Sequence, residues 1–236
     1  MASVGWAVAS AVVVVAVPVV LVVSSLNGLF YDPNFYLQGQ LRWAIGRTTE
    51  YTAEQLRPVN RGIVEFFSQP SLSLPAALQD SGASGNVFND REVGHMNDVR
   101  DIVRLVGRIG NIFLFLGLAV AIGRFALRGR SAWRWTTGRL AGGAALTVGV
   151  VVLFGALTMV DFEQLFLTFH EMSFSNDLWQ LDPRTDNLIR FFPFEFWYDA
   201  TVTVALRTVL SALVVGGAAL IARRWLRGGI GERAVP

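Results

Sequence analysis

The sequence predicts an all-α membrane protein: a single integral membrane domain, residues 1–236, built as a four-transmembrane-helix bundle. Hydrophobic residues make up 53% of the chain and charged residues 16%, too little charge to cover a soluble domain of this length. Four segments are apolar over the roughly 20 residues that a helix needs to cross a bilayer. An excess of arginine lies between the second and third apolar segments and after the fourth, which indicates the cytoplasmic side. The connections on the other side are then a helical and irregular extracytoplasmic insertion between helices 1 and 2 and a smaller one between helices 3 and 4.

The first predicted span, residues 4–29, is dominated by valine and contains Pro18. Valine is only a moderate helix former in water, but in lipid the backbone must satisfy its hydrogen bonds internally, so a helix is expected. No basic segment precedes the apolar stretch and no clear small-residue cleavage site follows it. We therefore expect this segment to be a retained helix rather than a cleaved signal peptide.

The other predicted spans are residues 109–127, 140–160 and 200–225. The third is rich in glycine and alanine, and small residues recur in the fourth. Such residues let membrane helices approach closely, although they are also simply common in membrane helices. The glycines in question are Gly142, Gly143, Gly149, Gly155, Gly216 and Gly217.

Charge placement predicts the orientation. Nine arginines and one acid lie in or beside residues 128–139 and 226–236, whereas residues 30–105 and 161–199 hold nine arginines and 17 acids. Arginine is enriched in cytoplasmic loops, so 128–139 and 226–236 are expected in the cytoplasm, with both termini. The two larger segments are then extracytoplasmic.

Within the first insertion, residues 52–67 have the apolar spacing of a helix, with Thr49 or Thr52 as its N-cap. Residues 68–86 are rich in serine, glycine and proline and are expected to form a mobile loop. From Asp90 to Arg108 the pattern is again helical, and this helix is expected to continue into the second span without a break.

Composition removes several kinds of catalysis. The chain has no cysteine, and all 20 basic residues are arginine, which excludes thiol nucleophiles, Schiff-base lysines and a Ser–Lys dyad. Neither the H-E-x-x-H zinc motif nor a G-x-S-x-G elbow occurs. The two histidines, His95 and His170, both fall in predicted extracytoplasmic segments.

On a helix, Arg91, Glu92 and Asp98 would share a face with His95. Carboxylates beside an imidazole orient one ring nitrogen and stabilise its charged form, as a general base requires. The alternative is an amphipathic surface helix whose charges pair in solvent.

His170 follows phenylalanines at helical spacing and precedes Asn176, Asp177, Asp182 and Asp186. These polar residues lie among Trp179 and other aromatic residues, an environment in which polar groups are costly unless they are paired or used. An interfacial aromatic belt is the alternative. A shared site would need the two imidazoles to approach within about 4–8 Å, so that both reach one substrate.

At these segments the sequence resembles the bacterial lipoprotein intramolecular transacylase (Lit) family. The resemblance covers most of the chain. One motif contains Phe88, Arg91-Glu92, His95-Met96 and Asp98-Val99. The second motif and the start of the helix at residue 52 contribute Phe169-His170, Phe174, Asn176-Asp177, Trp179, Leu181-Asp182-Pro183, Asp186, Leu188-Ile189, Pro193 and Tyr51-Thr52-x-Glu54-x-Leu56. At Pro193-Phe-Glu195 the chain departs from the family's pattern, which leaves the role of Glu195 open.

The resemblance implies an acyltransferase that moves an acyl chain from the glyceryl sn-2 ester of a lipoprotein to the α-amino group of its N-terminal cysteine. His95 would be the general base and His170 a second essential residue, as orienter, base partner or proton donor. Asp98 or Asp177 would orient an imidazole, while Arg91, Asn97 and Asn176 would contact the oxyanion or head group. Glu92, Trp179 and Asp182 are further candidates for substrate binding.

The expected partners are diacylglyceryl-modified lipoproteins and membrane lipid, with no nucleic acid, metal or cofactor. Two other classes remain: a membrane protein that binds a lipid or partner without catalysis, and a metal-dependent hydrolase using the histidines and nearby acids.

Overall fold

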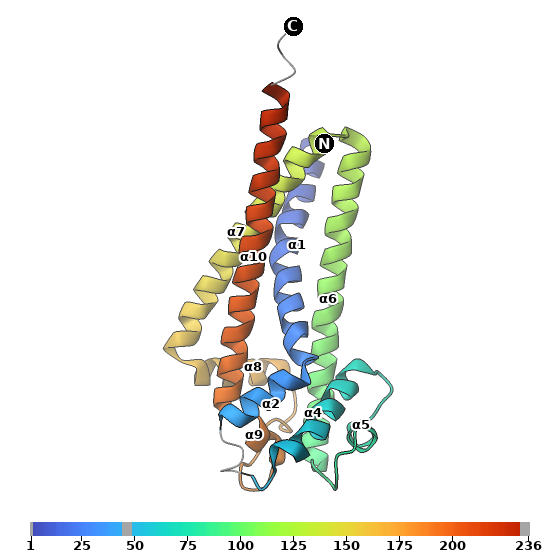
Figure 1. Ribbon diagram of the computed structural model, residues 1–236, viewed down its shortest axis with the longest axis vertical. Coiled ribbons are helices and arrows are strands. Elements are labelled where there is room, and N and C mark those ends of the chain that lie inside the picture. The colour runs from blue at the N-terminus through green and yellow to red at the C-terminus, as the bar shows by residue number, and fades with distance from the viewer. Residues whose placement is uncertain (1, 44–48, 232–236) are drawn as a thin grey trace. The chain divides into compact units, whose positions relative to one another are not determined.

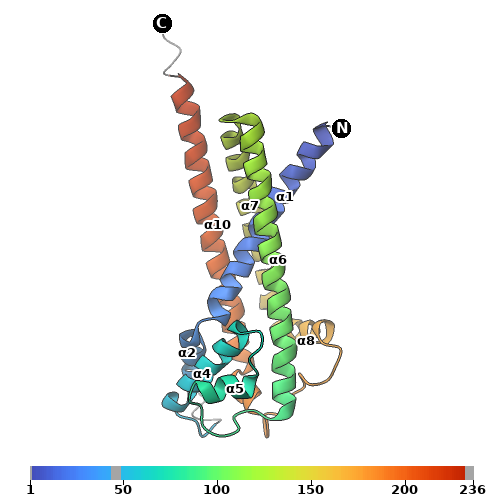
Figure 2. The same cartoon turned by 90° about the vertical axis from the view of Figure 1, so that its right-hand side faces the viewer.

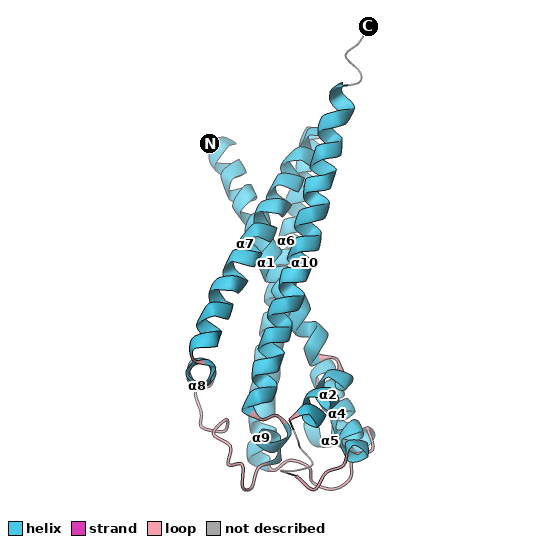
Figure 3. Ribbon diagram, turned by 60° about the vertical axis from the view of Figure 1, so that its left-hand side comes forward, coloured by secondary structure: helices cyan, strands magenta, loops and turns pink. Residues whose placement is uncertain are grey.

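A computed structural model describes residues 2–43 and 49–231 (Figure 1). This part of the chain is helical and contains no strand, and short loops join most helices (Figure 3). The predicted tail residues 232–236 and residues 44–48 of the first insertion lie outside the described ranges. The helices are α1 (Ala2–Phe30), α2 (Pro33–Arg42), α4 (Ala53–Ser68), α5 (Leu74–Asp80), α6 (Asp90–Arg128), α7 (Ser131–Val160), α8 (Phe162–Ser173), α9 (Asn187–Phe191) and α10 (Phe194–Gly231).

Four of these helices are long and apolar enough to cross a membrane, which confirms the predicted number of spans. They are α1, α6, α7 and α10, and each extends beyond the apolar segment seen in the sequence. The 39 residues of α6 form one unbroken helix, as expected (Figure 2). At 1.5 Å per residue it is about 58 Å long, while a hydrocarbon core is about 30 Å thick. Only part of α6 can therefore lie within lipid.

The chain divides into two compact units. The first comprises Met1–Ser25, Val106–Ala156 and Val204–Pro236. Its helices approach closely at Gly143, where an added Cβ would lie 2.6 Å from Val17 Cβ and 2.9 Å from the carbonyl oxygen of Val14. No such neighbour surrounds Gly149, Gly155 or Gly217, so only some of the small residues serve contact.

The second unit comprises Leu26–Leu105 and Leu157–Thr203 and has an aromatic core that includes Phe66, Phe191 and Phe196. Helix α4 begins as predicted: the Thr52 side chain accepts from the Gln55 N–H, and the Gln55 side chain accepts from the Thr52 N–H. This capping box satisfies two N–H groups that the helix itself leaves free.

The prediction that residues 68–86 form an irregular loop was wrong in part. Helix α5 lies within it, capped by Ser73, whose hydroxyl accepts from the Ala76 N–H. Leu74, Ala77 and Leu78 are buried in the core with α4. Tertiary burial and a serine cap therefore make a short helix out of a composition typical of loops.

The loop predicted at 128–139 is also shorter than expected. Helix α7 begins at Ser131, so only Gly129 and Arg130 connect it to α6. Gly129 has φ +53°, a conformation that glycine adopts without the Cβ clash of other residues. The arginines beyond this turn therefore lie in the first turns of α7.

Candidate active site

The two histidines lie side by side in the second unit. His95 is on the second turn of α6 and His170 near the end of α8, and their ring centroids are 5.9 Å apart. Their residues are 7% and 9% exposed. This spacing falls within the range that a shared site requires.

Aromatic rings surround the pair. The ring centroid of His170 lies 4.2 Å from that of Phe166 and 5.4 Å from that of Trp179. The Phe174 centroid lies 5.0 Å from that of His95 and 5.5 Å from that of His170. Phe166 is one turn before His170 on α8, and Phe174 is the C-cap residue of that helix. The site therefore has apolar walls, which strengthen electrostatic interactions inside it.

The tautomer of His170 follows from one contact. Its Nδ1 lies 2.8 Å from the carbonyl oxygen of Phe166, and because a carbonyl can only accept, Nδ1 carries the proton. The lone pair is then on Nε2, available to take a proton. Burial lowers the pKa of His170 below its ordinary value, although the hydrogen bond to Phe166 opposes this in part. His170 is therefore a neutral imidazole at physiological pH.

His95 has a different environment. Its Nδ1 is buried and has no hydrogen-bond partner. Asp98, one turn later on α6, accepts a hydrogen bond of 2.9 Å from the Asn176 side chain. The structure thus joins Asp98 to the segment after α8, and leaves Nδ1 of His95 without a hydrogen-bond partner.

That segment, residues 174–179, is held on the first turns of α6. Arg91 donates to the carbonyl oxygen of Asp177 and lies 3.7 Å from its carboxylate. The Nε of Arg91 is buried without a partner and remains a free donor. The Asn176 side chain bonds Asp98, and Leu178 packs against Gly94. These contacts fix Trp179 against His170.

Gly94 allows this close packing, because a Cβ there would lie 2.8 Å from Leu178 Cδ1. We expect Gly94→Ala to be nearly neutral, because the end of the Leu178 side chain can turn away while alanine favours the helix. Gly94→Leu should displace residues 176–179 and lower turnover about 10- to 100-fold, as misplaced catalytic groups do. Turnover and thermal unfolding of the purified variants test this, and equal turnover of the two variants would contradict it.

Glu92 has a structural role that the sequence did not assign to it. Its side chain accepts from the backbone N–H of Asn89 at 2.7 Å, and the Asn89 side chain accepts from the Glu92 N–H at 3.1 Å, which is a capping box at the start of α6. The other carboxylate oxygen accepts from the Leu188 N–H at 2.5 Å. Glu92 is 1% exposed.

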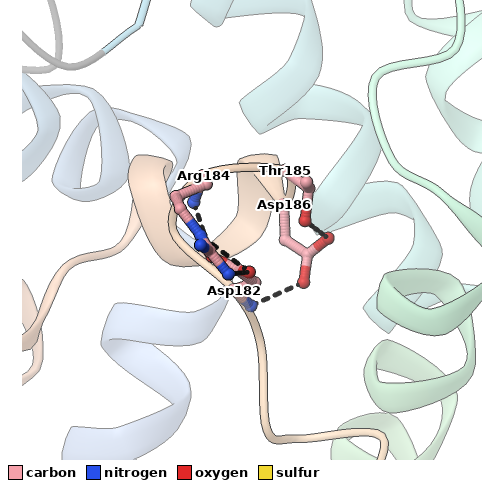
Figure 4. A network of polar contacts seen from close by, with 4 residues as sticks. All are labelled: Asp182, Arg184, Thr185 and Asp186. Atoms are coloured by element: carbon pink, nitrogen blue, oxygen red, sulfur yellow. Dashed lines mark hydrogen bonds and ion pairs between the residues drawn. The ribbon is translucent and has the colours of Figure 1, made fainter.

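Asp182 lies in a turn whose contacts are shown in Figure 4. Its carboxylate binds Arg184 at 2.6 Å, and its backbone N–H donates to Asp186. The hydrogen bonds from the Arg184 side chain and backbone lower the pKa of Asp182 to about 2. Asp186 also accepts from Asn89, so this turn is tied to the cap of α6.

The side chain of Asn97 points away from the two histidines. Two residues after His95, it lies about 200° around the helix from it. Its side-chain oxygen accepts from Arg100 at 3.0 Å, and Arg100 in turn covers the ring of Phe66. The structure therefore brings together His95, His170, Asp98, Asn176 and Trp179, with Arg91 and Asp177 beside them, but not Asn97.

Gly94, Leu178 and Asn89 were not singled out from the sequence. Asn89-x-x-Glu92 is the spacing of a capping box and was a usable signal, whereas the Gly94–Leu178 contact has no local signature. Among the described residues, no three histidine or acidic side chains lie close enough together to hold a metal ion.

Comparison with known proteins identifies the family. Residues 11–197 match the family described as lipoprotein intramolecular transacylase Lit. An uncharacterized protein of Aquifex aeolicus is 29% identical over 168 residues, which are 66% of this chain and 72% of that protein.

Among solved structures, the membrane integral lipoprotein intramolecular transacylase Lit of Bacillus cereus matches with a TM-score of 0.78 at 17% identity, covering 93% of this chain and 96% of that one. A variant of it with one histidine replaced by arginine matches with a TM-score of 0.74 at 16% identity, covering 94% and 93%. At this identity the structural likeness concerns the fold, while the family match covers well over half of the sequence. The chain belongs to the lipoprotein intramolecular transacylase Lit family of multi-pass membrane proteins.

Proposed function

We propose that this protein transfers an acyl chain, within one lipoprotein molecule, from the glyceryl sn-2 ester to the α-amino group of the N-terminal cysteine. The observation that carries the proposal is the pair of buried imidazoles, 5.9 Å apart in an aromatic enclosure. Family membership supports the reaction class. The chain has no cysteine or lysine to form an acyl-enzyme, so direct attack by the amine is favoured.

The reaction balances without a co-reactant. The amine nitrogen gives a proton to an imidazole and forms a bond to the ester carbonyl carbon. The bond from that carbon to the sn-2 oxygen then breaks, and the imidazolium returns the proton to this oxygen. Donor and acceptor belong to one molecule, so the substrate itself supplies much of the proximity. A histidine base contributes about 10²- to 10⁴-fold in rate.

In this proposal His95 is the base, because its buried Nδ1 has no other partner. His170 is held by Phe166 with Nε2 unprotonated, so it can share or relay the proton. Arg91 is the first candidate for the oxyanion, since its Nε is a free donor, and Asn176 is the second. Asp98 and Asp177 hold these donors in place rather than contacting the substrate.

The site would act at the extracytoplasmic face. Both histidines lie in the acidic segments 30–108 and 161–199, and the arginine-rich segments are those expected in the cytoplasm. The acyl esters of an anchored lipoprotein lie in the leaflet on that same side.

Expression in a bacterial host that does not N-acylate its lipoproteins tests the reaction. Because the transfer is intramolecular, the product has the same mass as the substrate, so tandem mass spectrometry must locate the acyl chain. The expected product has an amide at the N-terminal cysteine and one remaining ester. A mixture of light and isotope-labelled substrates should give no mixed product. A free amine on all lipoproteins, or hydrolysed ester without amide, would overturn the proposal.

Acid should destabilise the folded protein through His170. Its pKa is lowered in the folded state, so below the ordinary pKa of about 6.5 the unfolded chain binds more protons and stability falls as pH falls. His170→Phe removes this titration, and we expect its unfolding temperature to depend less on pH between about 7 and 5. Tryptophan fluorescence follows the unfolding. Parallel pH profiles for the two proteins would contradict the expectation; His95, which faces His170, still titrates in both.

A further inference from the structure

Helix α8 carries an apolar face that the rest of the second unit leaves uncovered. Met172 is 84% exposed and Phe169 50% exposed, in a helix of 12 residues. Leu165 lies one turn before Phe169, and on a helix these three side chains share one side. His170 and Phe166 point to the enclosed site instead.

The remaining side of α8 is largely polar, with Leu167, which is 38% exposed, at its edge. Gln164, Thr168 and Glu171 lie on it, and Gln164 donates to Thr168 at 3.2 Å. The helix is therefore divided into an inward side with the histidine, an uncovered apolar side and a polar side. This division is typical of a helix that lies in the plane of a membrane surface.

The position of α8 in the chain indicates what covers the apolar side. Its N-cap, Asp161, directly follows Val160, the last residue of a candidate membrane span. Met159 and Val160, at the end of that span, are 80% and 84% exposed. The backbone at Asp161 is not helical, so α8 is a separate helix that starts where α7 ends (Figure 3). An apolar surface thus continues from the lipid-facing span into α8.

The charges on α8 indicate that acyl chains, and not anionic head groups, would hold the helix. Helix α8 contains Glu163 and Glu171 but no arginine, whereas helices that bind anionic head groups carry basic residues on their polar face. Its attachment must then come from burial of apolar side chains among acyl chains.

We propose that α8 lies in the membrane–water interface, with Leu165, Phe169 and Met172 among the acyl chains of the adjacent leaflet. The partner is the lipid bilayer itself, independent of head-group charge. In this position the helix holds His170 at the depth of the lipid glyceryl esters. The inference rests on the exposure and order of these residues and not on the proposed chemistry.

The absence of cysteine makes depth measurement direct. Single-cysteine variants M172C and F169C, with E171C and Q164C as controls on the polar side, are labelled with an environment-sensitive fluorophore in phosphatidylcholine nanodiscs. Spin-labelled phosphatidylcholine should quench the labels at 172 and 169 at least about twofold more than those at 171 and 164. Aqueous iodide should show the reverse order.

Replacing half of the phosphatidylcholine with phosphatidylglycerol should leave these ratios unchanged. Equal quenching at all four positions would overturn the proposal, as would lipid quenching that requires phosphatidylglycerol. The proposal would also be overturned if M172C formed disulfides between copies of the protein and if shielding of its label from iodide depended on protein concentration. The partner of the apolar side would then be a second copy. None of these readouts depends on transferase activity, so a failure here is distinct from a failure of the proposed function.

Discussion

His95→Ala and His170→Ala should each lower the rate of acyl transfer by about 10²- to 10⁴-fold, the usual contribution of a positioned acid–base group. The imidazoles lie together in an apolar enclosure, and the proposed reaction requires a proton to leave the amine and reach the departing oxygen. Purified variants in nanodiscs, supplied with a diacylglyceryl lipopeptide, give the rate. Tandem mass spectrometry separates the isomeric product from the substrate.

Matched controls distinguish chemistry from folding. Asp101→Asn on α6 and Glu171→Gln on α8 alter exposed carboxylates on the same two helices and should retain full rate. The thermal unfolding temperature of each variant shows whether the core of the unit remains intact. Full activity of both alanine variants would exclude the histidine mechanism.

The double variant is the sharper test. If both imidazoles act on one proton path, removing the second after the first should cost little more, because residues that act as a unit are not additive. Two separate sites would instead give losses that multiply. A double variant that is slower than the worse single variant by the full factor of the other single substitution, about a further 10²- to 10⁴-fold, would therefore contradict the shared site.

The long helices could be predicted because hydropathy and the need to close backbone hydrogen bonds in lipid act within each segment. The start of α4 was predictable because its signal is also local: Thr52 and Gln55, three residues apart, cap the helix. Helix α5 was not, because its seven residues are stabilised by burial against α4 rather than by their own pattern.

A shared site requires His95 to approach His170, but no pattern in the sequence establishes the distance between them. That distance depends on how residues 176–179 dock on α6, through the Arg91–Asp177 contact and the packing of Leu178 on Gly94. Such contacts join segments that are distant in sequence and leave no periodic trace. Asn97 is different: helical geometry alone places it away from His95, because two residues correspond to about 200° of rotation.

Glu92→Ala should lower the free energy of unfolding by about 2–4 kcal/mol. The substitution leaves the buried N–H of Leu188 without an acceptor, which costs about 1–3 kcal/mol. It also removes the capping bond to the N–H of the exposed Asn89, which is worth about 1 kcal/mol. Glu92→Gln should lie between the wild type and the alanine variant, because the amide keeps one oxygen and its NH₂ group cannot accept. Thermal and denaturant unfolding in detergent micelles measure the change, with exposed Glu171→Ala as the control, expected within about 0.5 kcal/mol of wild type.

This measurement also decides between two roles for the residue. The resemblance favours Glu92 as a substrate contact, whereas its two hydrogen bonds and 1% exposure favour an anchor between the start of α6 and Leu188. A structural anchor predicts that activity, measured well below the unfolding temperature, falls no further in Glu92→Ala than in an equally destabilised core variant such as Ile63→Ala. A substrate contact predicts the opposite: the Glu92→Ala variant would keep wild-type stability and lose the rate of acyl transfer. Glu92 caps the start of α6 through the Asn89 N–H and holds the segment after α8 through the Leu188 N–H, so we expect the anchor role. Loss of this anchor should also loosen the packing of Trp179 against His170.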